Sequence, residues 1–230
     1  MFSDVFMAIT PQEMHCILPK RVAYMACHFS PSGTGLSNLP CTLPTGSLLL
    51  IDDSMPVQGH DPDAVLHQIN QMAETFSVKA VLLDFQRESS NEACEMVSAI
   101  AASCICPVVV TPSYSHIDNC GIFLPCPAVN MPLQVHLTPW LHKRIYLEIA
   151  RDTVRYTVTE EGCQSQPYFQ EIALPLSDEQ LHCHYDVFVF PEKAEFTLSR
   201  TSADLASLSQ EAYRMGVEGV VGLFQELQSA

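Results

Sequence analysis

The chain has 230 residues, of which 47% are hydrophobic and 16% are charged, and its formal net charge is −15. This composition supports a sizeable core and argues against a largely disordered chain. Because nucleic acids and anionic membranes attract clustered Lys and Arg, the acidic balance argues against both as partners.

The start of the sequence and its cysteines predict a cytoplasmic protein. Residues 1–6 lack the basic start and apolar core of a secretory signal. No apolar run approaches the roughly 20 residues that a membrane-spanning helix needs. The ten cysteines form no Cys-x-x-Cys pair, so we expect free thiols rather than a zinc ribbon.

Strands alternate with helices over the first 150 residues. Residues 1–20 fit no clear element. A helix begins at Pro62 with Asp61 as its cap, a second begins near Ser90, and each carries one apolar stripe at helical spacing. Apolar runs predict strands at residues 21–29, 47–51, 80–84, 107–111, 121–124 and 144–150.

The pattern changes after Ala150. Residues 153–159 alternate as a half-solvated antiparallel strand does, and residues 183–190 and 194–199 are typical of a hairpin. A last helix, capped by Thr201 or Ser202, and a strand over residues 217–223 then restore the strand–helix order.

We therefore predict an α/β fold in one domain spanning residues 1–230. It is a TIM-like (β/α)8 barrel with several outer helices missing and an antiparallel hairpin insertion near the C-terminus, at about residues 151–200. An open, doubly wound sheet is the alternative.

Polar residues follow the predicted strands at their carboxyl ends, where α/β barrels place their ligands. The carboxylates Asp53, Asp84, Glu148 and Glu226 are the catalytic candidates, because paired acids can run glycoside hydrolysis. The alternative to a catalytic role is a structural one, in which these acids lie at loop starts because they are well solvated and cap helices. Residues expected to contact a ligand are Asp52, Gln86, Arg87, Tyr114, Trp140 and Gln225.

Residues 79–86 carry a resemblance to a known family. The layout resembles the family-18 type glycoside hydrolases, barrels that act on chitin and peptidoglycan-like sugars and carry Asp-Gly-x-Asp-x-Asp-x-Glu at the end of their fourth strand. Aligning the last acid of that motif with Gln86 places Asp84 on the neighbouring Asp and Ala80 on the Gly. The earlier acids fall on Lys79 and Leu82 and do not match. The end of the chain, residues 202–223, is similar in style to the family's last helix and strand.

Gln86 stands where the family has its catalytic Glu, and this difference decides which activity the resemblance implies. The family's Glu protonates the glycosidic oxygen, and an amide has no titratable proton to give. We therefore expect a catalytically impaired barrel that binds a saccharide or related polar ligand, with Phe85, Tyr114 and Trp140 able to stack on a sugar. The alternative is an active hydrolase that uses Asp53, Glu148 or Glu226.

His182 and His184 are the remaining candidates. On a strand they face the same side, as a zinc pair does, and His28, His60 or His116 could add a ligand. A metal-dependent hydrolase is thus a further alternative, although two ligands alone define no zinc site. No Gly-rich motif opens a helix, so we expect no cofactor.

Overall fold

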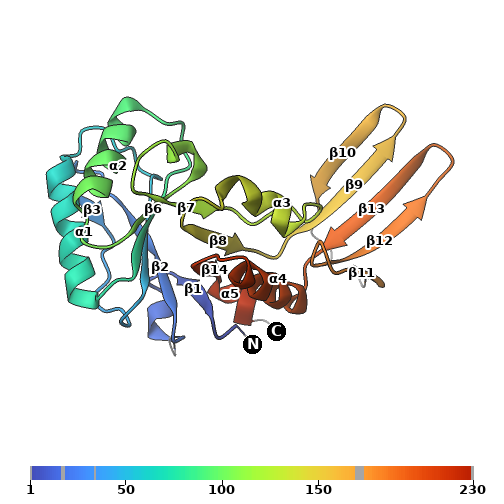
Figure 1. Ribbon diagram of the computed structural model, residues 1–230, viewed down its shortest axis with the longest axis horizontal. Helices are drawn as coiled ribbons and strands as arrows, with labels where there is room; N and C mark the ends of the chain where they lie inside the picture. Colours follow the sequence, from blue (N-terminus) through green and yellow to red (C-terminus); the bar gives the residue numbers. More distant parts are fainter. Residues whose placement is uncertain (1, 17–18, 34, 169–173, 229–230) are drawn as a thin grey trace.

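The computed structural model describes residues 2–16, 19–33, 35–168 and 174–228. Its main sheet runs in the order β1-β14-β8-β7-β6-β5-β4-β2, and β1 also pairs with β2. All of these pairings are parallel. The eight strands therefore close into a barrel, which confirms the predicted fold and rules out the open sheet (Figure 1). They are β1 (Val5–Ile9), β2 (Val22–Phe29), β4 (Leu48–Asp52), β5 (Ala80–Asp84), β6 (Val108–Val110), β7 (Gly121–Leu124), β8 (Ile145–Ile149) and β14 (Gly219–Leu223).

The first barrel strand lies in the segment that the sequence left unassigned. All five residues of β1 are buried. A continuous apolar run of this kind is the signature of a strand covered on both faces, so Val5–Ile9 did carry a readable signal. A short strand, β3 (Leu36–Ser37), pairs antiparallel with β2.

The outer layer is incomplete, as predicted. In the described part of the chain, full helices follow three of the strands: α1 (Pro62–Phe76), α2 (Asn91–Ser103) and α4 (Ser202–Arg214). The other helices are the short α3 (Leu133–Leu137) and α5 (Phe224–Gln228), and single 3-10 turns lie at Glu13–His15, Pro112–Tyr114 and Thr138–Trp140. Among the described residues, no helix is long and apolar enough to cross a lipid bilayer.

Side chains capping the helices explain where they begin. The Asp61 carboxylate accepts a hydrogen bond from the Asp63 N–H at 3.0 Å at the start of α1, which has Pro62 in its first turn. At the start of α4, Thr201 and Asp204 cap each other's backbone N–H groups in a capping box. The predicted caps Asp61 and Thr201 therefore make the hydrogen bonds that start these helices.

The barrel interior is a packed core rather than a pore. Strand residues alternate between the lumen and the outer layer. Gly219 faces the lumen beside Tyr146, and a Cβ there would lie 2.6 Å from the Tyr146 ring, so only glycine fits. The lumen-filling residues are Phe6, Ala8, Ala23, Leu48, Leu50, Ala80, Leu82, Val109, Phe123, Tyr146 and Val221.

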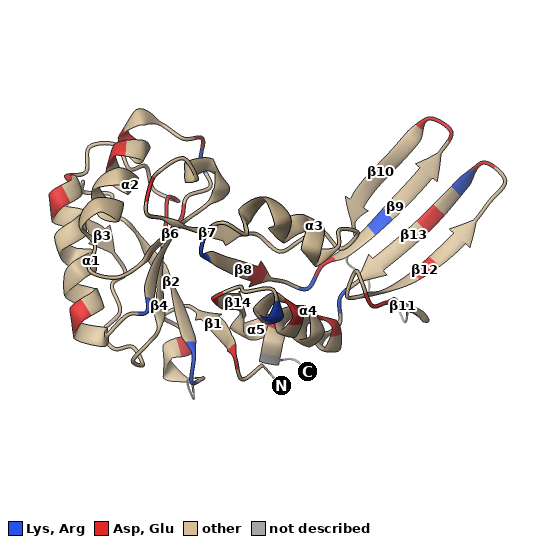
Figure 2. Cartoon of the chain, viewed as in Figure 1, with Lys and Arg blue, Asp and Glu red and all other residues tan. Residues whose placement is uncertain are grey.

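The antiparallel insertion is confirmed and is larger than a single hairpin. It is a five-stranded sheet in the order β10-β9-β13-β12-β11, which lies between β8 and α4 in the chain and extends away from the barrel (Figure 1). Its tips carry acidic residues, and acidic residues elsewhere are spread over helices, loops and strands such as β8 (Figure 2). The strands are β9 (Thr153–Thr159), β10 (Gly162–Pro167), β11 (Leu176–Asp178), β12 (Cys183–Val189) and β13 (Lys193–Ser199).

A buried arginine ties the insertion to the barrel. Arg200 is only 2% exposed, and its guanidinium donates to the carbonyl oxygens of Pro127, Ala128 and Leu181 at 2.6, 3.3 and 3.4 Å. Its Nη1 also lies 3.3 Å from the Cys126 sulfur. The bonds to Pro127 and Ala128 join the end of β13 to the loop after β7.

Candidate functional site

Three carboxylates face the mouth of the lumen. Asp52, Asp84 and Glu148 each lie two residues beyond a lumen-filling residue of the same strand, so strand alternation directs them to the same side. Asp52 and Asp84 are register partners on the neighbouring strands β4 and β5. Asp52, Asp84 and Glu148 thus form an acidic cluster at the carboxyl ends of the strands, above the packed lumen.

Two of these carboxyls, Asp84 and Glu148, have raised pKa values. Burial raises the pKa of Asp84 above its usual range, the charges of Asp52 and Asp53 add to the rise, and the Gln86 hydrogen bond opposes it. Burial likewise raises the pKa of Glu148, with further contributions from the charges of Asp84 and Glu226. The charge of Asp84 contributes to the shift at Glu148, so the two carboxyls lie close enough at the mouth to interact.

Gln86 lies at the end of the fourth barrel strand, counted along the chain from β1. Its amide nitrogen lies 3.2 Å from both carboxylate oxygens of Asp84. A pocket of about 410 Å³ opens here, lined by Asp52, Asp53, Ser54, Asp84, Gln86 and Arg87. The residue aligned with the family's proton donor is therefore a neutral hydrogen-bond donor to its neighbouring carboxylate.

Asp53 has a different setting from Asp52. It is only 5% exposed, and its two oxygens accept hydrogen bonds from the backbone N–H groups of Gln86 and Arg87 at 2.9 and 3.0 Å. The Arg87 guanidinium in turn donates to the Ser54 carbonyl at 2.5 Å. In this conformation, both oxygens of the predicted catalytic Asp53 are occupied in holding the loops after β4 and β5 together.

Glu226 and Gln225 lie on α5, directly after β14. A carboxylate oxygen of Glu226 accepts a hydrogen bond from the Arg151 N–H at 2.9 Å, which joins α5 to the start of the insertion. Gln225 is exposed. The charge of Glu226 contributes to the raised pKa of Glu148, so the Glu226 carboxylate lies near the barrel mouth.

The aromatic candidates lie elsewhere than predicted for sugar stacking. Tyr114 and Phe85 are each 1% exposed and pack edge to face at a centroid distance of 5.7 Å. Both belong to the core outside the barrel, and half-buried Trp140 packs against the same core. Tyr114 and Phe85 therefore present no ring face to a ligand in this structure.

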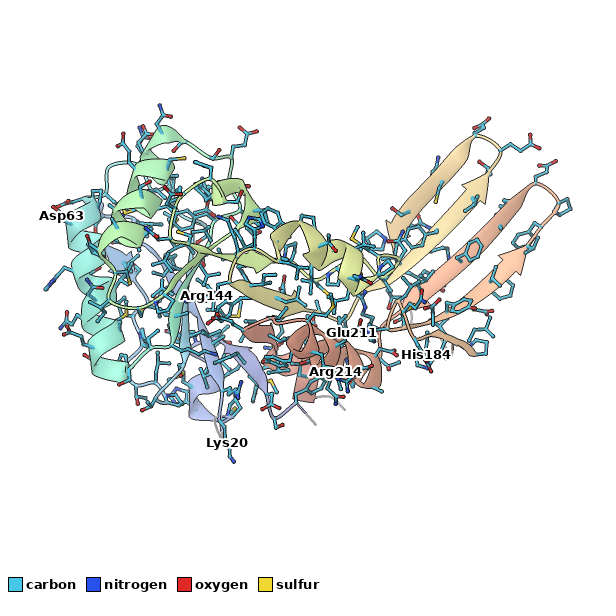
Figure 3. The ribbon with its side chains drawn as sticks, in the orientation of Figure 1. Lys20, Asp63, Arg144, His184, Glu211 and Arg214 are labelled. Atoms are coloured by element: carbon cyan, nitrogen blue, oxygen red, sulfur yellow. The ribbon has the colours of Figure 1, made fainter. Side chains whose placement is uncertain are left out.

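The two histidines dock the insertion onto α4. His182 Nε2 lies 2.7 Å from a Glu211 carboxylate oxygen, and His184 Nδ1 lies 2.8 Å from an Asp204 oxygen. Figure 3 labels Glu211 on α4 and His184 on the insertion. Across the described ranges, no three His, Cys, Asp or Glu side chains gather closely enough to hold a metal ion. Each histidine thus has a carboxylate partner where a zinc site would need further ligands.

Sequence reasoning missed Cys126 and Arg200. A backbone hydrogen bond from Cys126 to Glu148 opposes the rise in the Glu148 pKa, and Arg200 contacts the Cys126 sulfur. These residues come from the loop after β7 and from the end of the insertion, and no sequence pattern joins those two segments.

Comparisons with known proteins identify the fold. No protein-family model and no curated protein matches the sequence. Among solved structures, a GH18 chitinase from Cycas revoluta in complex with (GlcNAc)3 aligns with a TM-score of 0.56 and 8% identity, over 95% of this chain and 94% of that one. A GH18 N-acetylglucosaminidase from Paenibacillus barengoltzii gives 0.56 and 9%, over 98% of each chain. The spore cortex-lytic enzyme SleL of Bacillus cereus gives 0.56 and 9%, over 95% of this chain and 70% of that one.

At such identities the likeness concerns the fold alone. The chain has the fold of GH18 glycoside hydrolases, which confirms the resemblance inferred from residues 79–86 and 202–223. Whether its own site performs that chemistry depends on the residues at the barrel mouth.

Proposed function

We propose that this barrel binds an N-acetylated oligosaccharide, or a related polar ligand, at the carboxyl ends of its strands, without the proton-donating step of the fold's hydrolases. The observation that carries the proposal is Gln86. It stands at the end of the fourth barrel strand, hydrogen-bonded to both oxygens of Asp84. An amide there can still bind a sugar hydroxyl or carbonyl, but it has no proton to transfer.

Two further findings support saccharide binding. The mouth offers acceptor groups on three strands, Asp52, Asp84 and Glu148, and carboxylates bind sugar hydroxyls through charge-assisted hydrogen bonds. The Cycas revoluta chitinase, which shares the fold, is also solved as a double mutant with Gly-to-Trp and Glu-to-Gln substitutions in complex with (GlcNAc)4. We apply that ligand class to this chain as part of the proposal.

The test is a binding titration with (GlcNAc)4 and with peptidoglycan fragments by isothermal titration calorimetry, alongside a hydrolysis assay on the same ligands. Binding without hydrolysis is expected for the natural chain, with at least tenfold weaker binding for Asp84→Ala, because a charged hydrogen-bond partner is worth about 1.5–3 kcal/mol. Glu74→Gln is the matched control, since Glu74 is exposed on α1 outside the barrel mouth. Absence of binding to every saccharide would overturn the proposal.

The Gln86→Glu variant tests whether the missing proton donor is what prevents hydrolysis. The new carboxyl would lie beside Asp84, whose charge would raise its pKa, as a general acid requires. We expect this variant to gain slow hydrolysis that the natural chain lacks. Hydrolysis by the natural chain that survives Gln86→Ala would contradict the proposal.

A second candidate function rests on the two perturbed carboxyls. Burial raises the pKa of both Asp84 and Glu148, and pairs of acids with shifted acidity are typical of working hydrolases. In that case Glu148 would donate the proton and Asp84 would stabilise positive charge. Hydrolysis by the natural chain that disappears in Glu148→Gln, with saccharide binding retained, would establish this alternative.

A further inference from the structure

The opposite end of the barrel carries a pair of thiols. Cys104 ends α2, Cys106 precedes β6, and only Ile105 separates them. Their sulfur atoms lie 3.7 Å apart and both residues are half-buried. Because β6 begins just after this pair, the thiols lie at the amino-terminal end of the strands, away from the carboxylates at the mouth.

The backbone holds the two sulfurs on one side. Cys104 is extended, with φ −69° and ψ 135°, and Pro107 biases the preceding Cys106 toward the extended region too. In an extended segment the side chains of residues two apart point the same way. Ile105 accordingly points away from the pair, and it is 56% exposed.

Asn70 of α1 fixes this segment. Its amide nitrogen donates to the Ser103 carbonyl at 3.2 Å, and its amide oxygen accepts from the Ile105 N–H at 3.0 Å. On the other side, the Pro107 carbonyl accepts from the Val81 N–H at 2.9 Å within the barrel. The pair is therefore held between an outer helix and the sheet.

We propose that Cys104 and Cys106 form a reversible redox site that exchanges with low-molecular-weight disulfides of the glutathione type. The Cys104 thiolate attacks one sulfur of the disulfide, and the other sulfur leaves as a thiolate, which gives a mixed disulfide on Cys104. Cys106 loses its proton and attacks the Cys104 sulfur, which expels the second thiolate. The protein dithiol is oxidised by two electrons, and one external disulfide is reduced to two thiols.

The division of roles follows from the hydrogen bond between the thiols. The hydrogen bond with Cys106 lowers the pKa of the Cys104 thiol below its ordinary value, although burial opposes the change. The same hydrogen bond, together with burial, raises the pKa of Cys106. Since the thiolate is the nucleophile, Cys104 attacks first and Cys106 resolves.

The geometry favours reversible exchange over a permanent cross-link. An S–S bond of about 2.05 Å requires the sulfurs to approach by roughly 1.7 Å. Closing a loop of three residues restricts the unfolded chain little, so the disulfide adds little stability. A bond of this kind is easily reduced again, as labile and regulatory disulfides are.

The first experiment treats the reduced full-length protein with glutathione disulfide, followed by alkylation and peptide mass mapping. A disulfide between Cys104 and Cys106 is the expected product. In Cys106→Ala, glutathione should remain attached to Cys104, because the resolving thiol is gone. A natural chain that keeps glutathione on Cys104, or that leaves both thiols reduced while exposed Cys163 reacts, would overturn the proposal.

The second experiment measures the alkylation rate of Cys104 at pH 7 with iodoacetamide, with Cys163 of the same digest as internal reference. Loss of the hydrogen-bond partner in Cys106→Ala should raise the Cys104 pKa toward its ordinary value. The thiolate fraction at pH 7 then falls by more than the nucleophilicity of the thiolate rises, so the alkylation rate of Cys104 falls severalfold. Cys106→Ser, which keeps a hydroxyl donor, should recover part of the rate. Equal rates in all three proteins would contradict the assigned roles.

Discussion

Replacing Asp53 by Ala removes the group that holds the β5–α2 loop in place. The buried carboxylate accepts two backbone hydrogen bonds, from Gln86 at 2.9 Å and from Arg87 at 3.0 Å. A hydrogen bond to a charged group contributes about 1.5–3 kcal/mol. The two donors lie in an exposed loop and can turn to water, so the lower value applies to each. We therefore expect Asp53→Ala to lower the free energy of unfolding by about 3 kcal/mol.

Urea unfolding followed by far-ultraviolet circular dichroism measures this loss, and the melting temperature should fall by about 9 °C for a chain of this length. Asp52→Ala is the matched control: Asp52 is half-buried, and its carboxylate accepts a backbone hydrogen bond from the Ser54 N–H at 2.8 Å, so a loss of about 1.5 kcal/mol is expected.

Hydrogen exchange provides a local readout of the same contact. The amide protons of Gln86 and Arg87 should exchange faster in Asp53→Ala than in Asp52→Ala, because only the first change removes their acceptor. Losses that are equal in the two variants, or amide exchange that Asp53→Ala leaves unchanged, would refute the role given to Asp53.

Three further changes test the barrel and the insertion. Burial raises the pKa of Asp84 in the folded state. The protonated Asp84 therefore contributes to the free energy of unfolding below its ordinary pKa, and this contribution is lost as pH rises through the folded-state pKa. Asp84→Asn should therefore raise the melting temperature at pH 7 and do so less at pH 4, and a gain that grows on acidification would contradict this sign. Gly219→Ala should cost about 2 kcal/mol in urea unfolding, since its Cβ would meet the Tyr146 ring at 2.6 Å, and an unchanged midpoint would show that the lumen can adjust. Arg200→Met should lower the free energy of unfolding by about 3 kcal/mol, because it leaves the buried Pro127 carbonyl without its donor. Proteolysis between residues 150 and 200 should become faster, and an unchanged cleavage pattern would contradict the docking role of Arg200.

Local signals in the sequence were sufficient for much of the architecture. Strands buried on both faces appear as continuous apolar runs, and caps such as Asp61 and Thr201 mark helix starts, because both effects depend on near neighbours in the chain. The barrel, its missing helices and the antiparallel insertion followed from the order of these elements. Val5–Ile9 carries the same signal.

Tertiary structure alone decided what each strand-end residue does. Asp52 and Asp53 are adjacent in the chain, yet one faces the mouth and the other binds the backbone of the next loop, because a shift of one residue reverses the side of a strand. Tyr114, read as a sugar-stacking ring, is buried against Phe85. Arg200 meets Cys126 across 74 residues of chain. Such contacts depend on how distant segments pack, so the composition and spacing of the sequence determine the barrel, while the packed fold determines its site.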